Sequence, residues 1–316
     1  MLLLTSVVAF SQSKKGQKKA QPPPTDTVAP NIPGVVAGGT AVKVIKDGFQ
    51  STEGPVALPD GSMIFAEGRT NSVIKIDAND NVSTYVENTG GSNSLAIDGK
   101  GRLIGVQINP GETGIAVIHP AGSKAILAGN FEGKPFGRPN DLVVDKKGGI
   151  YFSDAGGQNS VPGMDPSVYY IQPDGKVVRV IEDIRPNGVQ LSPDEKTLYA
   201  VHTTNEYVLA FDVQPDGTLT NRRNFAKHPE VTRNGDQVRS GADGLAVDAA
   251  GRLYVATVAG VSVYGTNGAI LGTIPLSRSP QNLAFAGPDK KTLYVVGRGV
   301  AFKVSMLAEG HKGRAK

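Results

Sequence analysis

Along most of the chain, short apolar runs alternate with polar turn residues. After Val35 one unit recurs six times: an apolar run, a turn rich in Asp, Pro, Gly or Lys, and a second apolar run. The copies read VALPDGSMIFAE, LAIDGKGRLIGVQ, LVVDKKGGIYFSDA, VQLSPDEKTLYAVH, LAVDAAGRLYVATV and LAFAGPDKKTLYVVG. Apolar runs of this kind, bounded by turn residues, predict β-strands joined by hairpins.

The spacing of the units predicts the architecture. One residue marks each hairpin turn, and consecutive markers stand 39 to 56 residues apart: Gly61, Gly101, Gly148, Glu195, Gly251 and Lys290. A third apolar run follows most copies, as in SVIKIDAND and VYYIQPDG. Repeats of roughly 40 to 50 residues with several short strands each are typical of a β-propeller. The sequence therefore predicts an all-β, six-bladed β-propeller. A large β-sandwich is the alternative, but it does not account for the period.

The strand predicted at residues 41–49 precedes the first unit and has no partner within it. We expect it to pair with strands from the C-terminal end of the chain and to close the ring. Closure of this kind removes the unpaired sheet edges that promote aggregation.

A short polar stretch precedes each of the six units. The stretches are Thr52-Glu53-Gly54-Pro55, Ser92-Asn93-Ser94, Arg138-Pro139-Asn140-Asp141, Arg185-Pro186-Asn187-Gly188, Gly241-Ala242-Asp243-Gly244 and Ser279-Pro280-Gln281-Asn282. Each carries Glu, Asn, Asp or Gln at an equivalent place. The innermost strand of a propeller blade lines the central channel, so these oxygen-bearing side chains are predicted to point at the axis. Turn capping explains a single Asn or Asp before a strand, but six aligned copies favour a shared site.

Four of these residues form a predicted metal site: Glu53, Asn140, Asn187 and Asp243. Two carboxylates brought close together repel each other unless a cation lies between them. Carboxylates and carboxamides are hard oxygen donors that suit Ca²⁺, Mg²⁺ or Mn²⁺, with Zn²⁺ as a further alternative. The prediction is one divalent cation, with Ca²⁺ as the first choice, because no histidine cluster favours zinc.

The charge balance excludes a nucleic-acid partner. The chain has 316 residues, 33 Lys and Arg, 29 Asp and Glu, and a pI near 9.1. Seven of the cations and two of the acids lie before Val35 or after Met306, which leaves 26 basic and 27 acidic residues in the body. The basicity therefore belongs to the ends of the chain, and we expect residues 307–316 to form a flexible, solvated basic tail. The absence of cysteine excludes disulfides and thiolate chemistry.

The first 35 residues are predicted to lie outside the folded body, which spans residues 36–306. MLLLTSVVAFSQ is too short to span a bilayer and is similar to the apolar region of a secretory signal, although a basic region before it is missing. The Lys- and Pro-rich stretch that follows reads as a disordered linker. We expect a periplasmic or secreted protein, or a cytoplasmic one if the segment is not a signal. We also expect a monomer or weak dimer with a small-molecule substrate.

Four motifs carry a resemblance to a known family. In chain order they are EGPVALPDG, RPNDLVVDKKGGIYFSD, PNGVQLSPDEKTLYAV and DGLAVDAAGRLYVA. Together, over roughly residues 49–306, the chain resembles the senescence-marker-protein/gluconolactonase (regucalcin-like) family, which includes diisopropylfluorophosphatase-type enzymes. The resemblance implies a six-bladed propeller with one divalent cation in its channel. It also implies that Glu53, Asn187 and Asp243 are metal ligands and that Asn140 is a ligand or a substrate contact.

The resemblance further implies substrate contacts from Arg138, Asp154 and Asn93. The chain departs from the pattern at Ala57, at Gln107, and at His202-Thr203-Thr204. These departures lie at the rim of the expected pocket, so they bear on the substrate more than on the metal.

The activity that the resemblance implies is metal-dependent hydrolysis of a sugar lactone. The cation polarises the ring carbonyl and lowers the pKa of a bound water, while Asp243 accepts a proton or only holds the metal. Phosphotriester hydrolysis and a non-catalytic, exported metal-binding propeller are the alternatives. A strictosidine-synthase-like propeller fits the oxygen donors less well. The chain lacks a G-x-S-x-G motif, and its four histidines show no triad context, so a serine hydrolase is disfavoured.

Overall fold

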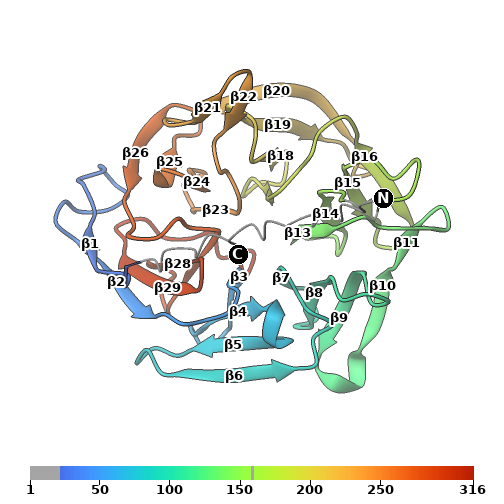
Figure 1. Ribbon diagram of the computed structural model, residues 1–316, viewed down its shortest axis with the longest axis horizontal. Helices are drawn as coiled ribbons and strands as arrows, with labels where there is room; N and C mark the ends of the chain where they lie inside the picture. Colours follow the sequence, from blue (N-terminus) through green and yellow to red (C-terminus); the bar gives the residue numbers. More distant parts are fainter. Residues whose placement is uncertain (1–21, 158–159) are drawn as a thin grey trace, which may run out of the picture.

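Six antiparallel sheets surround a central axis in the computed structural model, which describes residues 22–157 and 160–316 (Figure 1). This arrangement confirms the predicted six-bladed β-propeller. In every blade the innermost strand is the first of the unit, and in the first five blades the outermost strand is the last. Each inner strand therefore begins at one face of the ring and ends at the other. We call the face where the inner strands begin the mouth, and the opposite one the closed face.

The blades follow one another in chain order. The first blade contains β3 (Glu53–Ala57), β4 (Met63–Glu67), β5 (Ser72–Ile76) and β6 (Val82–Glu87). The second contains β7 (Leu95–Ile97), β8 (Leu103–Gln107), β9 (Gly114–His119) and β10 (Ala125–Ala128). The third contains β13 (Pro139–Val144), β14 (Ile150–Asp154), β15 (Ser167–Ile171) and β16 (Val177–Ile181).

The remaining blades complete the circle. The fourth contains β17 (Val189–Leu191), β18 (Thr197–Ala200), β19 (Tyr207–Val213) and β20 (Leu219–Lys227). The fifth contains β23 (Leu245–Val247), β24 (Leu253–Thr257), β25 (Gly260–Tyr264) and β26 (Ile270–Ile274). The sixth contains β27 (Asn282–Ala286), β28 (Thr292–Gly297) and β29 (Val300–Ser305), with β2 (Ala41–Lys46) and β1 (Thr27–Val28) added from the start of the chain.

Two small hairpins and two short helical turns lie between these strands. The hairpins are β11 (Asn130–Phe131) with β12 (Lys134–Pro135), and β21 (Thr232–Asn234) with β22 (Gln237–Arg239); the 3-10 turns are η1 (Gly68–Thr70) and η2 (Ala121–Ser123). Both hairpins directly precede an inner strand, so they lie on the mouth side of the ring.

Pairing between the two ends of the chain closes the ring. Strand β2 lies antiparallel to β29, with Val42 opposite Val304 and Val44 opposite Phe302. The sequence predicted this pairing for residues 41–49, and the structure confirms it for β2. The last blade consequently draws strands from both ends, and its outer edge is extended by β1.

The segment before β2 is more ordered than the sequence predicts. Ile32, Val35 and Val36 are buried, with at most 1% of their surface exposed, in the core between the fifth and sixth blades. The prediction of a disordered linker is therefore wrong for residues 27–35, because apolar side chains of this stretch cover a hydrophobic surface of the last blades. The signal-like segment lies in residues 1–21, outside the described residues. No helix in the described ranges is long and apolar enough to cross a membrane.

The hairpin turns explain why the six units look alike in sequence. All six marker residues have positive φ angles, from +53° at Lys290 to +87° at Gly148. In the second unit Asp98 accepts hydrogen bonds from the backbone N–H groups of Lys100 and Arg102, both at 2.9 Å. A carboxylate that holds the turn and a residue that tolerates the left-handed region are what such a turn requires.

The hydrophobic core is divided among the blades. Six clusters of buried side chains lie between the six pairs of neighbouring blades. Aromatic rings reinforce several of them, as where Tyr254 and Phe285 meet edge to face at 5.0 Å between centroids. In the absence of tryptophan, tyrosine, phenylalanine and aliphatic side chains supply this packing. The resulting ring holds the starts of the six inner strands in fixed positions.

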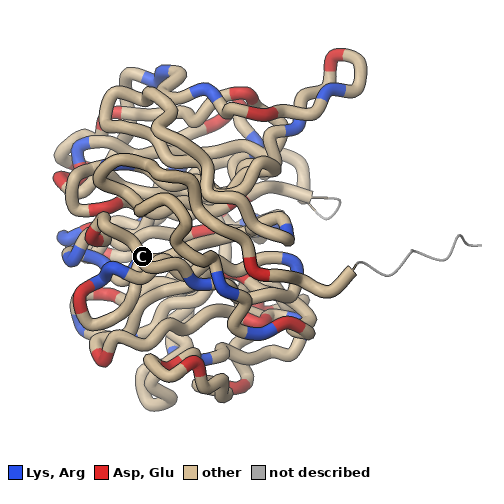
Figure 2. Tube along the Cα trace, turned by 90° about the vertical axis from the view of Figure 1, so that its left-hand side faces the viewer, with Lys and Arg blue, Asp and Glu red and all other residues tan. Residues whose placement is uncertain are grey.

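The C-terminal residues fold onto the propeller, so the prediction of a solvated basic tail is wrong. The backbone N–H of Ala57 donates to the carbonyl of Ala315 at 2.8 Å, and the Arg314 side chain pairs with Glu195 at 3.0 Å. Only 5% of the surface of Lys316 is exposed. The end of the described chain lies at the centre of the ring in Figure 1, and on the side with many Lys and Arg positions in Figure 2. The charges of Arg314 and Lys316 are buried because Glu195 and Asp141 pair with them there.

Candidate functional site

The starts of neighbouring inner strands touch one another around the mouth. A side chain at Gly54 (φ +52°) would collide with the backbone of Ser94 on the next blade, and one at Gly188 would collide with the carbonyl oxygen of Asp243. Glycine is therefore needed at these two places for the strands to approach. This close packing brings the polar stretch before each strand toward one axis, as the sequence predicts.

Glu53 is a buried acid on the first inner strand. Its carboxylate accepts hydrogen bonds from Asn282 Nδ2 at 3.1 Å and from Gln281 Nε2 at 3.3 Å, so it contacts the sixth blade. Burial raises the pKa of Glu53 to about 7, and the carboxylate of Asp141 adds to this rise against the opposing hydrogen bond from Asn282. No basic side chain is hydrogen-bonded to this acid in the described structure.

Asp243 lies across the channel at the start of the fifth inner strand. Its backbone N–H donates to the carbonyl of Ala256 at 3.0 Å, which fixes the backbone. Burial raises the pKa of Asp243 well above its ordinary value, and the nearby carboxylate of Glu53 raises it further, while Arg298 opposes the rise. The influence of Glu53 on the pKa of Asp243 indicates that the two carboxylates lie within electrostatic range of each other.

The three asparagines occupy the mouth between these acids. Asn93 donates through Nδ2 to the backbone oxygen of Asn140 at 3.0 Å and to its Oδ1 at 3.3 Å. Asn187 donates through Nδ2 to Thr203 Oγ1 at 3.0 Å, and its Oδ1 is buried without a hydrogen-bond partner. Thr203 thus orients the amide so that its oxygen stays available.

Arg138 and Asp154 form a separate element of the mouth. The Asp154 carboxylate is 1% exposed and accepts the backbone N–H groups of Gly137 at 2.8 Å, Arg138 at 2.6 Å and Gly156 at 2.9 Å. It holds the loop in place, and its role as a direct substrate contact stays a prediction.

The Arg138 side chain is exposed on this loop. Arg185 and Arg298, which the sequence did not single out, are exposed on two other mouth loops.

The donor set fits a divalent cation. Two interacting carboxylates and a buried amide oxygen without a partner are costly to keep in a protein interior. A cation bound by Glu53, Asn140, Asn187 and Asp243 would relieve both costs. Within the described ranges no group of three or more His, Cys, Asp or Glu side chains could hold a metal. Amide oxygens would therefore have to complete the coordination of any ion at the mouth.

Sequence reasoning missed a third acid beside the mouth. Asp141 is 1% exposed and accepts hydrogen bonds from Ser94 Oγ at 2.6 Å, from its neighbour Leu142 at 3.0 Å and from the backbone N–H of Val189 at 3.3 Å. These contacts tie the second, third and fourth blades together. The sequence signal was present in the stretch Arg138-Pro139-Asn140-Asp141, where Asn140 drew attention and Asp141 did not.

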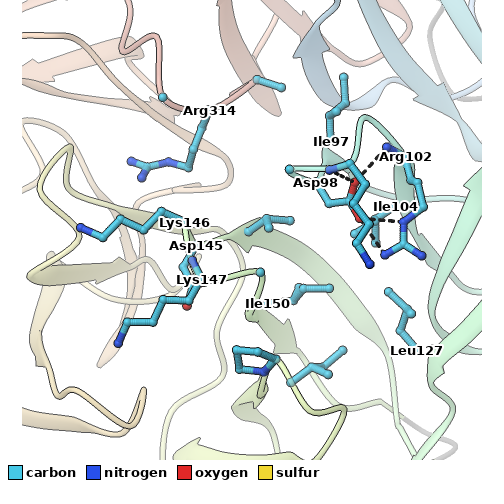
Figure 3. A pocket seen from close by; sticks show the side chains of 18 of the residues that line it. Ile97, Asp98, Arg102, Ile104, Leu127, Asp145, Lys146, Lys147, Ile150 and Arg314 are labelled. Atoms are coloured by element: carbon cyan, nitrogen blue, oxygen red, sulfur yellow. Dashed lines mark hydrogen bonds and ion pairs between the residues drawn. The ribbon is translucent and has the colours of Figure 1, made fainter.

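A cavity of about 680 Å³ lies at the closed face, away from these residues (Figure 3). Hairpin turns from the first three blades and residues 312–315 line it, with Ile97, Ile104 and Ile150 among its apolar side chains and Arg314 on another side. The cavity contains none of the predicted site residues. Residues 312–315, in the C-terminal segment, form one wall of this cavity.

Comparisons with known proteins agree with the geometry. A family profile described as "SMP-30/Gluconolactonase/LRE-like region" matches residues 51–298. A gluconolactonase of Zymomonas mobilis is 27% identical over 304 residues, which cover 84% of this chain and 82% of that protein. The lactonohydrolase oryL of Aspergillus oryzae is 26% identical over 72% of this chain and 55% of its own length.

Solved structures show the same fold. A gluconolactonase of Xanthomonas campestris superposes with a TM-score of 0.78 at 25% identity, covering 91% of this chain and 99% of that chain. A calcium-binding regucalcin of Agrobacterium tumefaciens superposes with a TM-score of 0.71 at 20% identity, covering 86% of this chain and 95% of that one. At that lower identity the second similarity concerns the fold alone.

Proposed function

The chain belongs to the SMP-30/gluconolactonase/LRE-like family, and on that premise we propose that it is a lactone hydrolase that depends on one divalent cation. The observation that carries the proposal is the pair of interacting acids, Glu53 and Asp243, beside the buried amide oxygen of Asn187 that has no partner. Relatives named gluconolactonase and lactonohydrolase support lactone hydrolysis as the reaction.

The cation would be held by Glu53, Asn140, Asn187 and Asp243. Ca²⁺ is the proposed ion, because carboxylate and carboxamide oxygens are the ligands it prefers. When bound, a divalent cation polarises a carbonyl oxygen and lowers the pKa of a coordinated water.

The chain's own residues orient the reactants. Thr203 fixes the amide of Asn187, and Asn282 with Gln281 fixes the carboxylate of Glu53. Asp243 has no hydrogen-bond donor to its carboxylate among the described residues, so its oxygens are free to accept a proton from water at the mouth. Burial and the carboxylate of Glu53 raise the pKa of Asp243 in the cation-free site, and a cation bound by this carboxylate would lower it again.

The substrate would lie above the acids, among the mouth loops. Exposed Arg138 can donate to lactone hydroxyls, and Asn93 and Asn140 present further polar groups beside it. Asp154 contributes by fixing the loop of Arg138 through three backbone hydrogen bonds. A polyhydroxylated lactone matches this mixture of donors and acceptors, and a sugar lactone is the proposed substrate class.

The test compares two substrate classes with and without metal. Purified protein is assayed with glucono-δ-lactone and with a phosphotriester, before and after exhaustive chelation, and again after Ca²⁺, Mg²⁺, Mn²⁺ or Zn²⁺ is added back. We expect lactone hydrolysis that disappears on chelation and returns best with Ca²⁺. Faster phosphotriester turnover would favour the alternative activity, and lactonase activity that survives complete metal removal would contradict the proposal.

A further inference from the structure

Lys316 carries a buried charge in the channel. Its Nζ lies 2.7 Å from Asp141 Oδ1 and 2.8 Å from Oδ2, and only 4% of the Lys316 side chain and 1% of the Asp141 side chain are exposed. The partners are 175 positions apart in the sequence. Residues 312–315, which form a wall of the cavity in Figure 3, carry the lysine there from the closed face.

Contacts of the two residues before Lys316 hold the lysine in its position in the channel. Arg314 pairs with Glu195 at 3.0 Å and donates to the carbonyl of Leu191 at 2.6 Å, while the carbonyl of Ala315 accepts from Ala57. These contacts join the C-terminal segment to the first and fourth blades. The position of the ammonium group is therefore set by the fold of the closed face.

The ammonium group lies next to the proposed cation site. Asp141, its partner, directly follows Asn140 on β13, and the Asp141 carboxylate also accepts a hydrogen bond from Ser94, the neighbour of Asn93. Glu53, Asp141, Asp243 and Lys316 together bring three carboxylates and one ammonium group to this channel. One divalent cation would bring their summed charge to zero, and a second cation would exceed it.

From this arrangement we infer that Lys316 is a positioning residue that occupies the inner half of the acidic channel. Because its ammonium group is paired with Asp141, this carboxylate does not bind the divalent cation, which binds only at the mouth, between Glu53 and Asp243. The inference rests on the proposed cation site and deepens it. A purely structural lysine would stabilise the fold without changing the affinity for the cation in a charge-dependent direction.

A double-mutant cycle separates these two roles. Calcium titrations by calorimetry are run on chelator-treated wild type, Lys316→Met, Asp141→Asn and the double variant. Removing the lysine leaves an extra negative charge, so we expect Ca²⁺ uptake about tenfold tighter or a second bound equivalent. Removing the Asp141 charge leaves an extra positive charge, so we expect binding about tenfold weaker. The neutral double variant should bind within about twofold of wild type, because the two changes cancel.

Lys312→Met is the matched control. Lys312 lies in the same segment, but its side chain is 67% exposed and pairs with Glu309. Removing this solvated charge should change Ca²⁺ affinity less than about twofold, because surface charges are screened. Far-UV circular dichroism establishes that each variant is folded. If Lys316→Met alone fails to fold, the double variant, which buries no uncompensated carboxylate, still supplies the decisive comparison with Asp141→Asn.

The outcomes distinguish this inference from the proposed function. Ca²⁺ binding that is unchanged or weaker in folded Lys316→Met overturns the role of Lys316 and leaves the mouth site intact. A double variant that binds as weakly as Asp141→Asn also overturns it. Wild-type protein that takes up no divalent cation contradicts both the proposed site and the role of Lys316.

Discussion

The two ends of the channel are built from the same six strands but treat their charges in opposite ways. Toward the closed face, buried carboxylates meet cations: Glu195 pairs with Arg314 and Asp248 with Arg252 at 2.5 Å, while Lys316, which enters the channel from that face, pairs with Asp141. At the mouth, Glu53 has only amide donors, and no donor reaches the carboxylate of Asp243 among the described residues.

This difference shows that the carboxylates paired toward the closed face stabilise the fold, whereas the carboxylates at the mouth remain available to bind a ligand. A buried ion pair that loses one partner becomes strongly destabilising, so the closed face has little freedom to change. The mouth acids are held close together without a cation from the chain, which raises the free energy of the folded state. A bound divalent cation would reverse that cost, and the following changes test each half of the comparison.

The largest effect is expected from removing a mouth acid. Asp243→Asn keeps the shape of the side chain but removes its charge and its ability to accept a proton. We expect kcat/KM for a sugar lactone to fall by about a thousandfold, because the residue proposed as both metal ligand and proton acceptor is lost. Steady-state kinetics with added Ca²⁺ measure the change. Asp236→Asn, on the exposed β21–β22 hairpin, is the control and should be neutral; more than a tenth of wild-type activity in Asp243→Asn would refute its role.

At the closed face the expected effect is on stability. Arg314→Met leaves the carboxylate of Glu195 without its cation, where the two side chains are 7% and 12% exposed. The free energy of unfolding should fall by about 3 kcal/mol, as measured by urea denaturation. Arg222→Met is the control, because its pair with Asp183 is largely exposed and should contribute at most about 1 kcal/mol. Equal losses in the two variants would show that the closed face is not stabilised by buried pairing.

In cation-free protein, Glu53 should make the folded state less stable as the pH rises. Its pKa is about 7 in the folded state, against an ordinary value of 4.5, so the folded state favours the protonated acid. The free energy of unfolding should therefore fall by about 3 kcal/mol as the pH rises from about 4.5 to 7, and level off above that. Glu53→Gln should remove most of this fall and be more stable than wild type at pH 8. Denaturation at several pH values, with chelator present, checks the sign; a wild type that gains stability over this range through Glu53 would contradict it.

The smallest effect is expected at the rim. Arg138→Ala removes an exposed donor but leaves the loop fixed by Asp154. KM for a polyhydroxylated lactone should rise about tenfold, equivalent to about 1.4 kcal/mol, with kcat nearly unchanged. Initial rates over a range of lactone concentrations separate the two constants. A fall in kcat alone would move Arg138 from substrate binding to the chemical step, and Arg222→Ala on the outer strand β20 should alter neither.

The repeating parts of the fold were accessible from sequence because they depend on local chemistry. Each hairpin needs a turn residue with positive φ, and the residue types at Gly101 and Gly148 reveal it. The placement of Glu53 and Asp243 at the starts of two inner strands followed from the period of the repeat. By contrast, the pairing of Lys316 with Asp141 depends on a contact between distant segments, and a lysine-rich end looks solvated until its partner is known.

The same limit applies to the start of the chain and to Asp154. Ile32 and Val36 are buried only because the last blades present a surface for them, which no local pattern records. Asp154 reads as a polar residue near the pocket, but its carboxylate is engaged by three backbone N–H groups. Hydrogen bonds of that kind depend on the path of the loop rather than on residue type.

Pairing between β2 and β29 also governs the order of events during biosynthesis. Strand β2 leaves the ribosome early and β29 late, so the nascent chain must carry an unfinished ring through most of its synthesis. Until β29 is synthesised, the edge of β2 that will pair with it is open and can pair with another molecule. A chain stalled before residue 300 would lack the β2–β29 pairing. We expect it to be degraded or to aggregate rather than to accumulate as a smaller active enzyme.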